Sequence, residues 1–465
     1  MASQIKFGTD GWRAIIADDY TVDNVKRVAE ATALWLKKNK KKKVVIGYDC
    51  RFGGSLFANV TAQVLGAHGI KVLLAPSFVS TPMVSLGVQK TKSDLGIVIT
   101  ASHNPPSYNG FKLKSHFGGP AFQSTINEVE AMIPEVCTTV LPSLKDMEAK
   151  KLLEYVDLEK MYIQQVKKGF DLKKIKESGI KIAYDAMYGA GQRAFKQILP
   201  RAVMLHCDLN PGMHGQAPEP IHKNLLLLSE TIKRNPAIQL GIATDGDADR
   251  IGLYDGEGNF VDSHHILLLL LLYMHKYKKS TGEVVITFSV TDKMRDMAKA
   301  FNIPCEVTKI GFKYIAEIMT QRDVMVGGEE SGGLAVKGHI PERDGIWIGL
   351  MILEFMATTK KSLKELIKEV YDIVGPFASE RDDLHLTNEK KESIVAICNS
   401  TPYKKFGNYK VESLETIDGW KFNLGNGEWV MMRASGTEPV LRVYAQSKDL
   451  AGARAILEAT KATIL

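Results

Sequence analysis

The stretch DLGIVITASHNPPSYNGFKLK, residues 94–114, joins a continuous apolar run to a polar loop that contains Ser102. A continuous apolar run is typical of a parallel strand that is buried on both faces. The two prolines and the glycine after it favour a stiff loop, so the sequence places Ser102 where a buried strand ends. No G-x-S-x-G pattern surrounds this serine, which argues against the nucleophile elbow of an α/β-hydrolase.

Apolar strands alternate with helical segments on both sides of this stretch, in three regions of the chain. Short connections between such elements indicate layered α/β structure. Residues 375–465 differ, because the paired strand patterns EWVMMRASG and VLRVYAQS precede a final helical pattern, AGARAILEATKATI. This order predicts a C-terminal α+β module with a mainly antiparallel sheet.

Breaks in the pattern give the expected domain ranges. A polar segment lies near residues 141–155, the turn-rich sequence DGEGNF occupies residues 255–260, and the pattern changes again near Pro376. We therefore expect an α/β fold with domains at residues 1–150, 151–256 and 257–374, followed by an α+β domain at residues 375–465.

The composition of the 465-residue chain argues against several classes of protein. Hydrophobic residues make up 45% of the chain and charged residues 24%, as in ordinary globular proteins, so disorder is not expected. The net charge of +7 is mild and suits acidic small molecules. The basic run KKNKKKK, residues 37–43, has no interleaved aromatic residues to stack on bases, so we expect no nucleic-acid partner.

The cysteines and apolar runs predict a cytoplasmic protein. The five cysteines are widely scattered and include no C-x-x-C pair, which argues against a disulfide framework and a zinc site. The longest apolar run, residues 266–274, is shorter than the ~20 residues that cross a bilayer and predicts a buried helix. Residues 1–13 lack the apolar core of a signal peptide. We expect no membrane partner, and no oligomeric state is inferred.

Three aspartates at alternate positions in TDGDADR predict a metal site. In an extended segment Asp245, Asp247 and Asp249 project to one side, where three carboxylates repel one another unless a cation lies among them. Oxygen-only ligands select a hard cation such as Mg²⁺, which also binds phosphate oxygens. An EF-hand does not fit, because Arg250 stands where glycine is needed and Gly256 where glutamate is needed. An Asp-rich turn with capping duties is the alternative.

Ser102 gains a role beside such a metal. A cation could hold a phosphate on the serine oxygen, and covalent catalysis splits one hard transfer into two easier steps. His103 is a second candidate for a catalytic role. Adjacent residues on an extended chain point apart, however, so a direct Ser–His hydrogen bond is not expected. Lys112 or Lys114 could act as acid or base if neighbouring cations lower its pKa. A solvated surface charge is the alternative for either lysine.

Two further loops have the composition of binding sites. In RASGTEP, residues 433–439, a guanidinium, two hydroxyls and a glycine amide can converge on one anion, with a plain hairpin turn as the alternative. In GGEESGG, residues 327–333, a glutamate and a serine suit hydrogen bonds to sugar hydroxyls, with a flexible surface loop as the alternative. Ligand groups gather at the carboxyl ends of strands in open α/β sheets, so these loops could line one cleft. The combination predicts a sugar-phosphate substrate.

These motifs resemble those of the α-D-phosphohexomutase superfamily. TASHNP, DGDADR, GEESGG and RASGTEP occur in the family's order after an opening FGTDGWR, and the resemblance extends over essentially the whole chain. It implies four domains around a central cleft, three of them related α/β domains with mixed sheets and the fourth an α+β domain.

The resemblance also implies roles for individual residues. Ser102 matches the phosphoserine that donates and regains the phosphoryl group, and its oxygen would complete the Mg²⁺ shell of the three aspartates. Lys112 matches the general acid/base, and Arg13 and Arg250 match cations near the transferring phosphate. The positions that match substrate-binding residues are Arg13, Arg250, Glu329, Ser331, Arg343, Arg433, Ser435, Gly436 and Thr437.

The family chemistry implies a phosphohexomutase. Phospho-Ser102 would give its phosphate to a hexose 1-phosphate, and the hexose 1,6-bisphosphate would return its other phosphate and leave hexose 6-phosphate. GEES followed by HIPERDG, residues 339–345, resembles the glucose-preferring branch, with Arg343 in the place of a lysine, so we expect glucose.

Several alternatives to a glucose mutase stay open. Mannose or glucosamine phosphates would use the same mechanism, and a sugar-bisphosphate synthase could use the same site. A phosphatase is disfavoured because no motif suggests that water reaches phospho-Ser102. A non-enzymatic sugar-phosphate-binding paralogue is disfavoured because the chain keeps Ser102 and all three aspartates.

Overall fold

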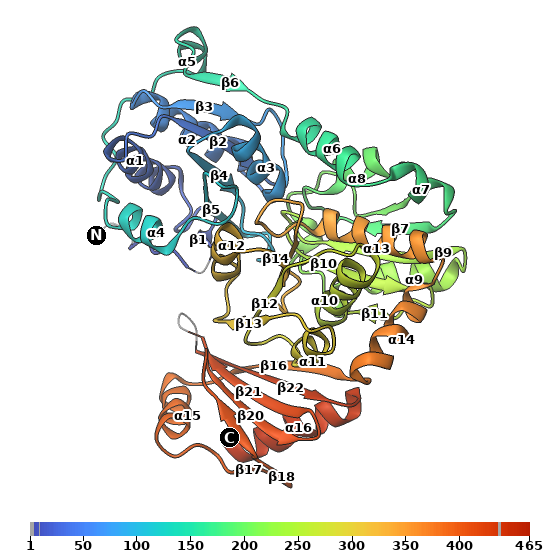
Figure 1. Cartoon of the computed structure of the whole chain (residues 1–465). Helices are drawn as coiled ribbons and strands as arrows, with labels where there is room; N and C mark the ends of the chain where they lie inside the picture. The colour runs from blue at the N-terminus through green and yellow to red at the C-terminus, as the bar shows by residue number, and fades with distance from the viewer. Residues whose placement is uncertain (1–3, 9, 436–438) are drawn as a thin grey trace. The chain divides into compact units, whose positions relative to one another are not determined.

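The computed structural model describes residues 4–8, 10–435 and 439–465 (Figure 1). The chain forms two compact units. The first unit runs to Gly282 and continues over Gly311–Leu366, and the second unit contains Glu283–Ile310 and Ile367–Leu465. Among the described residues, every helix is too short or too polar to cross a membrane.

The first sheet of the first unit contains the strand expected before Ser102. Its strands are β1 (Trp12–Ile15), β2 (Lys43–Tyr48), β3 (Lys71–Leu74), β4 (Leu95–Ile99), β5 (Tyr108–Ser115) and β6 (Leu153–Tyr155). They lie in the order β1-β5-β4-β2-β3-β6. All residues of β4 are buried, and this strand pairs in parallel with β2 and antiparallel with β5. The sheet is therefore mixed, and the apolar run before Ser102 is confirmed as a buried strand.

Local capping explains where helices of this region begin. The helices are α1 (Val22–Lys38), α2 (Gly54–Ala67), α3 (Thr81–Thr91), α4 (Gln123–Glu130) and α5 (Leu144–Ala149). The side chain of Thr21 accepts the amide hydrogen of Asn24 at the start of α1, and Ser80 accepts that of Met83 at the start of α3. Such caps typically stabilise a helix by about 1 kcal/mol. The apolar faces of strands and helices share one core that includes Ile97.

The second sheet of the first unit positions the aspartate motif. Its strands are β7 (Lys181–Asp185), β8 (Val203–Leu205), β9 (Ile238–Thr244), β10 (Ile251–Asp255) and β11 (Phe260–Val261). They lie in the order β11-β10-β9-β7-β8, with β7 parallel to β8 and β9 and the remaining pairs antiparallel. The accompanying helices are α6 (Leu158–Gly169), α7 (Leu172–Glu177), α8 (Gln192–Ile198) and α9 (Leu226–Arg234). Residues 245–250 form the tight connection between antiparallel strands β9 and β10.

The remaining elements of the first unit include two buried helices. The elements are α10 (Ser263–Leu272), α12 (Phe312–Gln321), β14 (Val324–Gly328), β15 (Leu334–Val336) and α13 (Gly345–Thr359), and β14 pairs antiparallel with β15. The leucines of α10 lie on all sides of this helix, and nearly all residues of α10 and α13 are buried. A helix that is apolar on all sides is expected inside a protein core. The prediction of a buried helix near residues 266–274 is thus confirmed. The helix α14 (Leu363–Val374) continues from the first unit into the second.

The second unit contains a wholly antiparallel C-terminal sheet. Its strands are β16 (Ala378–His385), β19 (Ser413–Glu415), β20 (Trp420–Gly425), β21 (Glu428–Ala434) and β22 (Val440–Ser447), in the order β16-β22-β21-β20-β19. The accompanying elements are α15 (Asn388–Ser400), β17 (Lys405–Phe406), β18 (Tyr409–Lys410) and α16 (Leu450–Ile464). This arrangement confirms the predicted α+β module.

The segment Glu283–Ile310 belongs to the same unit as this sheet. It contains β12 (Glu283–Thr287), α11 (Lys293–Ala300) and β13 (Cys305–Thr308), with β12 parallel to β13. Thr291 donates a hydrogen bond of 2.5 Å to Gln446 of β22. The ammonium of Lys421 on β20 lies over the ring of Phe288 and 3.2 Å from Asp292. These polar contacts join the segment to the C-terminal sheet.

Candidate active site

Ser102 lies in the loop between β4 and β5. It is 1% exposed and its backbone has a φ of +53°, in the left-handed region that L-residues rarely adopt. Its hydroxyl donates a hydrogen bond of 2.6 Å to Oδ2 of Asp245. The loop of residues 245–250 approaches so closely that a Cβ added to Gly246 would lie 2.5 Å from the carbonyl oxygen of Ser102, which explains the glycine. The two motifs therefore meet at Ser102.

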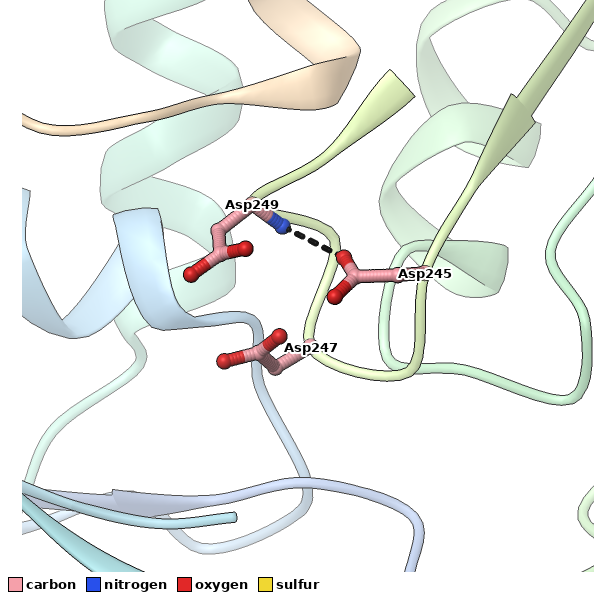
Figure 2. A group of neighbouring side chains, drawn as sticks. All are labelled: Asp245, Asp247 and Asp249. Carbon is pink, nitrogen blue, oxygen red and sulfur yellow. Dashed lines mark hydrogen bonds between the residues drawn. The ribbon is translucent and has the colours of Figure 1, made fainter. Parts of the chain in front are cut away.

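The three aspartates form the expected cluster, but their backbone is not the extended segment that was expected. All three are buried, and each offers an oxygen within 4.8 Å of the others (Figure 2). The segment is a tight turn and not an extended strand, with Ala248 at a φ of +57°. Oδ1 of Asp245 accepts the amide hydrogens of Asp249 at 2.9 Å and Arg250 at 3.0 Å. The chain thus folds back on Asp245, so the alternation argument was wrong although the cluster exists.

The carboxylate oxygens of this cluster suit a hard cation. Among the described residues, Oδ1 of Asp247 and Oδ1 of Asp249 are buried and have no hydrogen-bond partner. Burial, with the charges of Asp247 and Asp249, raises the pKa of Asp245 well above its usual value. An Asp-rich turn would explain the oxygen that caps the backbone, but not two buried oxygens without partners. The donor set fits Mg²⁺, which prefers oxygen ligands.

Lys112 on β5 faces the same cluster. Its ammonium lies 2.9 Å from Asp247, 3.3 Å from Asp249 and 2.9 Å from Asp10. Burial alone would lower the pKa of Lys112, but these three carboxylates raise it well above its usual value. The condition that neighbouring cations lower this pKa is not met, because carboxylates outweigh cations around this ammonium.

Asp10 is a charged residue of this site that the sequence analysis missed. It lies 2.6 Å from Arg343 and 2.9 Å from Lys112. Burial would raise its pKa, but Arg343 and Lys112 hold it well below the usual value. The sequence could have indicated this residue, because Asp10 is the only carboxylate in the opening motif FGTDGWR.

Lys114 is held away from the cluster by another missed residue. Its ammonium donates a hydrogen bond of 2.6 Å to Glu342, and both side chains are fully buried. Glu342 also accepts the backbone amide hydrogen of Arg343. This pairing gives Lys114 a structural role. Lys112 is the lysine that faces the aspartates.

Arg343 links the aspartate cluster to the GEESGG loop. It lies 2.7 Å from Asp249 and 4.0 Å from Oε2 of Glu329. Burial raises the pKa of Glu329 to about 7, although Arg343 opposes the shift. Ser331 is half-buried in the turn that follows Glu329. Backbone contacts between Arg250 and Gly333 join this turn to the loop of residues 245–250.

Arg13, Arg250 and His103 add positive charge and a neutral ring near Ser102. Arg13 donates a hydrogen bond of 2.6 Å to Asn104 in the serine loop. Burial lowers the pKa of Arg13 while Asp10 opposes the shift. Burial, with the charges of Arg250 and Arg13, also holds the pKa of His103 well below its usual value. The Ser102 hydroxyl donates to Asp245 and not to its neighbour His103.

The RASGTEP motif lies in the second unit, at the end of β21. Arg433 Nε is 3.3 Å from Asp418, and the Ser435 amide donates a hydrogen bond to the carbonyl of Val440. Gly436 and Thr437 lie outside the described residues. The described part of this motif is a strand end that pairs with β22.

Comparisons with known proteins agree over the whole length of the chain. Family models for the alpha/beta/alpha domains I, II and III of phosphoglucomutase/phosphomannomutase match residues 4–138, 160–258 and 262–374. The model for the C-terminal domain of the same family matches residues 386–462.

Individual relatives carry different substrate names. A phosphoglucomutase/phosphomannomutase of Thermococcus kodakarensis is 30% identical over 97% of this chain and 96% of its own. A phosphoglucosamine/phosphogalactosamine mutase of Sulfurisphaera tokodaii is 29% identical over 95% of each chain. The crystal structure of a candidate phosphomannomutase from Thermus thermophilus is 32% identical, has a TM-score of 0.88 and covers 100% of both chains. This chain therefore belongs to the phosphoglucomutase/phosphomannomutase family of the α-D-phosphohexomutase superfamily.

Proposed function

We propose that this protein interconverts hexose 1-phosphates and hexose 6-phosphates through phospho-Ser102 and a hexose 1,6-bisphosphate intermediate. The observation that carries the proposal is the buried hydroxyl of Ser102, 2.6 Å from one of three clustered carboxylates and near several cations. A phosphoryl group on this oxygen would lie among charges that suit its transfer. A serine placed only for structure would not need this set of buried ionised groups.

Mg²⁺ is the proposed cofactor, held by Asp245, Asp247, Asp249 and the phosphorylated Ser102. When bound, the cation neutralises charge on the transferring phosphoryl group. Lys112 is a cation in this site, so its first proton transfer would be a donation. Its proposed acid/base role fits a proton delivered to the Ser102 oxygen when the phosphate leaves.

The remaining residues are proposed to bind substrate. Arg13, Arg250 and the neutral ring of His103 would contact the transferring phosphate, and the Arg433 motif would bind a substrate phosphate. Glu329 and Ser331 would accept and donate hydrogen bonds to sugar hydroxyls, with Arg343 orienting Glu329. The distances among the residues of the first unit support this division, and the Arg433 assignment rests on the motif.

The identity of the sugar belongs to this proposal. The expected glucose preference came from the GEES and HIPERDG patterns. The names of the relatives, which include mannose and glucosamine mutases, favour those sugars instead. We propose mannose and glucosamine phosphates as the first substrates to test, with glucose phosphate as the third.

Domain ranges and compartment are proposals as well. The ranges 1–150, 151–256, 257–374 and 375–465 are proposed as units of function. All five cysteines are free thiols, which suits a reducing cytoplasm.

Parallel assays of the three hexose 1-phosphates test this function. Each would be incubated with the protein, Mg²⁺ and a catalytic amount of glucose 1,6-bisphosphate, and formation of the hexose 6-phosphate would be measured. We expect turnover of at least one sugar at ~1–1000 s⁻¹, the usual range for enzymes. Absence of turnover with all three sugars would refute the proposed function.

A further inference from the structure

The backbone of Ser102 is held in an unusual conformation by two residues outside the proposed chemistry. A φ of +53° costs energy for serine and persists only where the surroundings fix it. Such conformations cluster at functional sites, where the strain directs a side chain. The contacts that fix Ser102 lead to Asp49 and Arg51, which follow the end of β2.

Arg51 binds the carbonyl side of the serine loop. Its Nη2 atom donates hydrogen bonds to the carbonyl oxygens of Ser102 at 2.5 Å and Asn104 at 2.6 Å. Its Nη1 atom donates to the carbonyl oxygens of Pro105 at 2.7 Å and Tyr108 at 3.0 Å. Arg51 is 3% exposed, so one buried guanidinium gathers four carbonyls of a single loop.

A second series of contacts connects the amide of Ser102 to Asp49 and Arg51. The Ser102 amide donates a hydrogen bond of 2.9 Å to Oγ1 of Thr100. The Thr100 hydroxyl donates a 2.5 Å bond to Oδ2 of Asp49, and this oxygen lies 3.3 Å from Nε of Arg51. The carbonyl of Ser102 therefore binds Arg51 directly. Its amide is connected to Arg51 through contacts with Thr100 and Asp49. All four residues are buried.

We propose that Arg51, oriented by Asp49, is a positioning residue that sets the conformation of Ser102 for phosphoryl transfer. The proposal rests on the proposed function and adds a residue to which that function gives no role. A lysine cannot replace this arginine, because one ammonium cannot span carbonyls that the planar fork reaches from two nitrogens. Arg51 donates to the carbonyl of Ser102 and not to its hydroxyl, so it acts on the geometry of the reacting group.

The test compares Arg51→Lys with the matched control Arg27→Lys. Arg27 is also a buried arginine of the first unit, and it donates to the carbonyl of Pro134 and the side chain of Asn24. Crystal structures of both variants and the unmodified protein would give the φ of Ser102. We expect Arg51→Lys to move this φ out of the left-handed region and Arg27→Lys to leave it near +53°.

Kinetics provide a readout that a general loss of stability would not give. We expect Arg51→Lys to lower kcat by at least about tenfold, since small displacements of a reacting group have large effects on rate. KM should change less than kcat, because Glu329, Ser331 and Arg433, which are proposed to bind the sugar and the other phosphate, lie outside the serine loop. The fraction of Ser102 that becomes phosphorylated by glucose 1,6-bisphosphate in a short incubation, measured by intact mass, should fall with kcat.

A second variant keeps the proposal falsifiable if Arg51→Lys does not fold. Thr100→Val preserves shape but breaks the link between the Ser102 amide and Asp49, and we expect the same shift in φ and loss of kcat. A φ near +53° in either folded variant, or unchanged kcat, would overturn the proposal. Absence of mutase activity in the unmodified protein would overturn the proposed function instead, while the φ comparison would still decide the role of Arg51.

Discussion

Ser102 donates a hydrogen bond of 2.6 Å to Asp245, a residue 143 positions further along the chain. The serine lies after a strand of the first sheet and the aspartate after a strand of the second. The bond therefore joins loops that follow strands of two different sheets, and it places the hydroxyl beside the aspartate cluster. The pKa of Asp245 is raised by burial and by Asp247 and Asp249, so this carboxylate gains from a donor or a cation.

Replacing Ser102 with alanine should abolish mutase activity and leave the fold intact. We expect at least about a thousandfold loss of kcat, as for removal of a covalent nucleophile. The variant should still fold, with a melting temperature lower by a few degrees, because the lost hydrogen bond contributes about 1–3 kcal/mol. Intact mass should show no phosphoserine. Ser107→Ala, at an exposed position of the same loop, is the control, and near-normal turnover of Ser102→Ala would refute the covalent mechanism.

Removal of the proposed Mg²⁺ should cause a reversible loss of mutase activity. We expect EDTA to lower activity by at least about a hundredfold and Mg²⁺ to restore it, because three buried carboxylates need a compensating cation. Asp247→Asn should weaken Mg²⁺ binding at least about tenfold in calorimetric titration.

A half-buried aspartate outside the cluster offers a control for the metal experiment. Asp94→Asn changes a residue that accepts backbone amide hydrogens of Lys42 and Lys43, and we expect normal Mg²⁺ binding from it. Full activity of the unmodified protein in metal-free buffer would contradict a metal site at the aspartates.

The fold followed from the sequence where pattern and environment agree. The apolar run before Ser102 became β4, and the paired patterns near the C-terminus became β21 and β22. Their signals are strong because side chains of a buried strand must be apolar at consecutive or alternate positions. The joining of Glu283–Ile310 to the C-terminal sheet was not predicted, because contacts such as Thr291–Gln446 connect residues distant in sequence.

The site was predicted by residue type more than by geometry. The aspartates and Ser102 were found because carboxylates and a serine stood at strand ends. The turn that gathers the aspartates depends on Ala248 in a left-handed conformation, which no spacing rule indicates. The direction of the pKa shift of Lys112 was left as a condition, since its sign depends on Asp10, a residue about 100 positions away that was not considered.

Replacing Lys112 with glutamine should reduce both activity and stability. Loss of one charged hydrogen-bond donor typically costs ~1.5–3 kcal/mol, so we expect kcat to fall roughly ten- to a hundredfold. The variant also leaves Asp10, Asp247 and Asp249 without their ammonium partner. Mg²⁺ should therefore raise the melting temperature of Lys112→Gln more than that of the unmodified protein. An equal Mg²⁺ effect in both proteins would contradict the charge argument.

The stability cost of Glu329 should depend on pH. Its pKa rises from the ordinary 4.5 to about 7 in the folded protein. Below pH ~4.5 both folded and unfolded states keep the proton, so full stability is present there. As the pH rises to about 7 the unfolded state loses its proton first, and the folded state becomes less stable by up to about 3 kcal/mol.

Glu329→Gln removes this pH-dependent term. Melting temperatures of the variant and the unmodified protein should be similar at pH 4.5, and the variant should gain relative stability up to pH ~8. The control is Glu177→Gln, which changes a glutamate whose side chain is 63% exposed. A constant difference for Glu329→Gln would show that folding does not raise the pKa of this carboxyl group.

Replacing Arg433 with alanine should impair both directions of the reaction equally. In the proposed mechanism the intermediate turns round between its two half-reactions, so both hexose 1-phosphate and hexose 6-phosphate present a phosphate that is not being transferred. One guanidinium that binds this phosphate serves both substrates, and its loss should depress kcat/KM by at least about tenfold in each direction. Arg454→Ala, on α16 of the same unit, removes an arginine that pairs with Glu380 and Asp382 and should leave kcat/KM unchanged. Initial rates measured from each hexose phosphate, with the sugar that turns over fastest, give the comparison. Impairment of Arg433→Ala in one direction only would refute a shared phosphate anchor, because a residue bound to one substrate alone affects only the half-reaction that uses it.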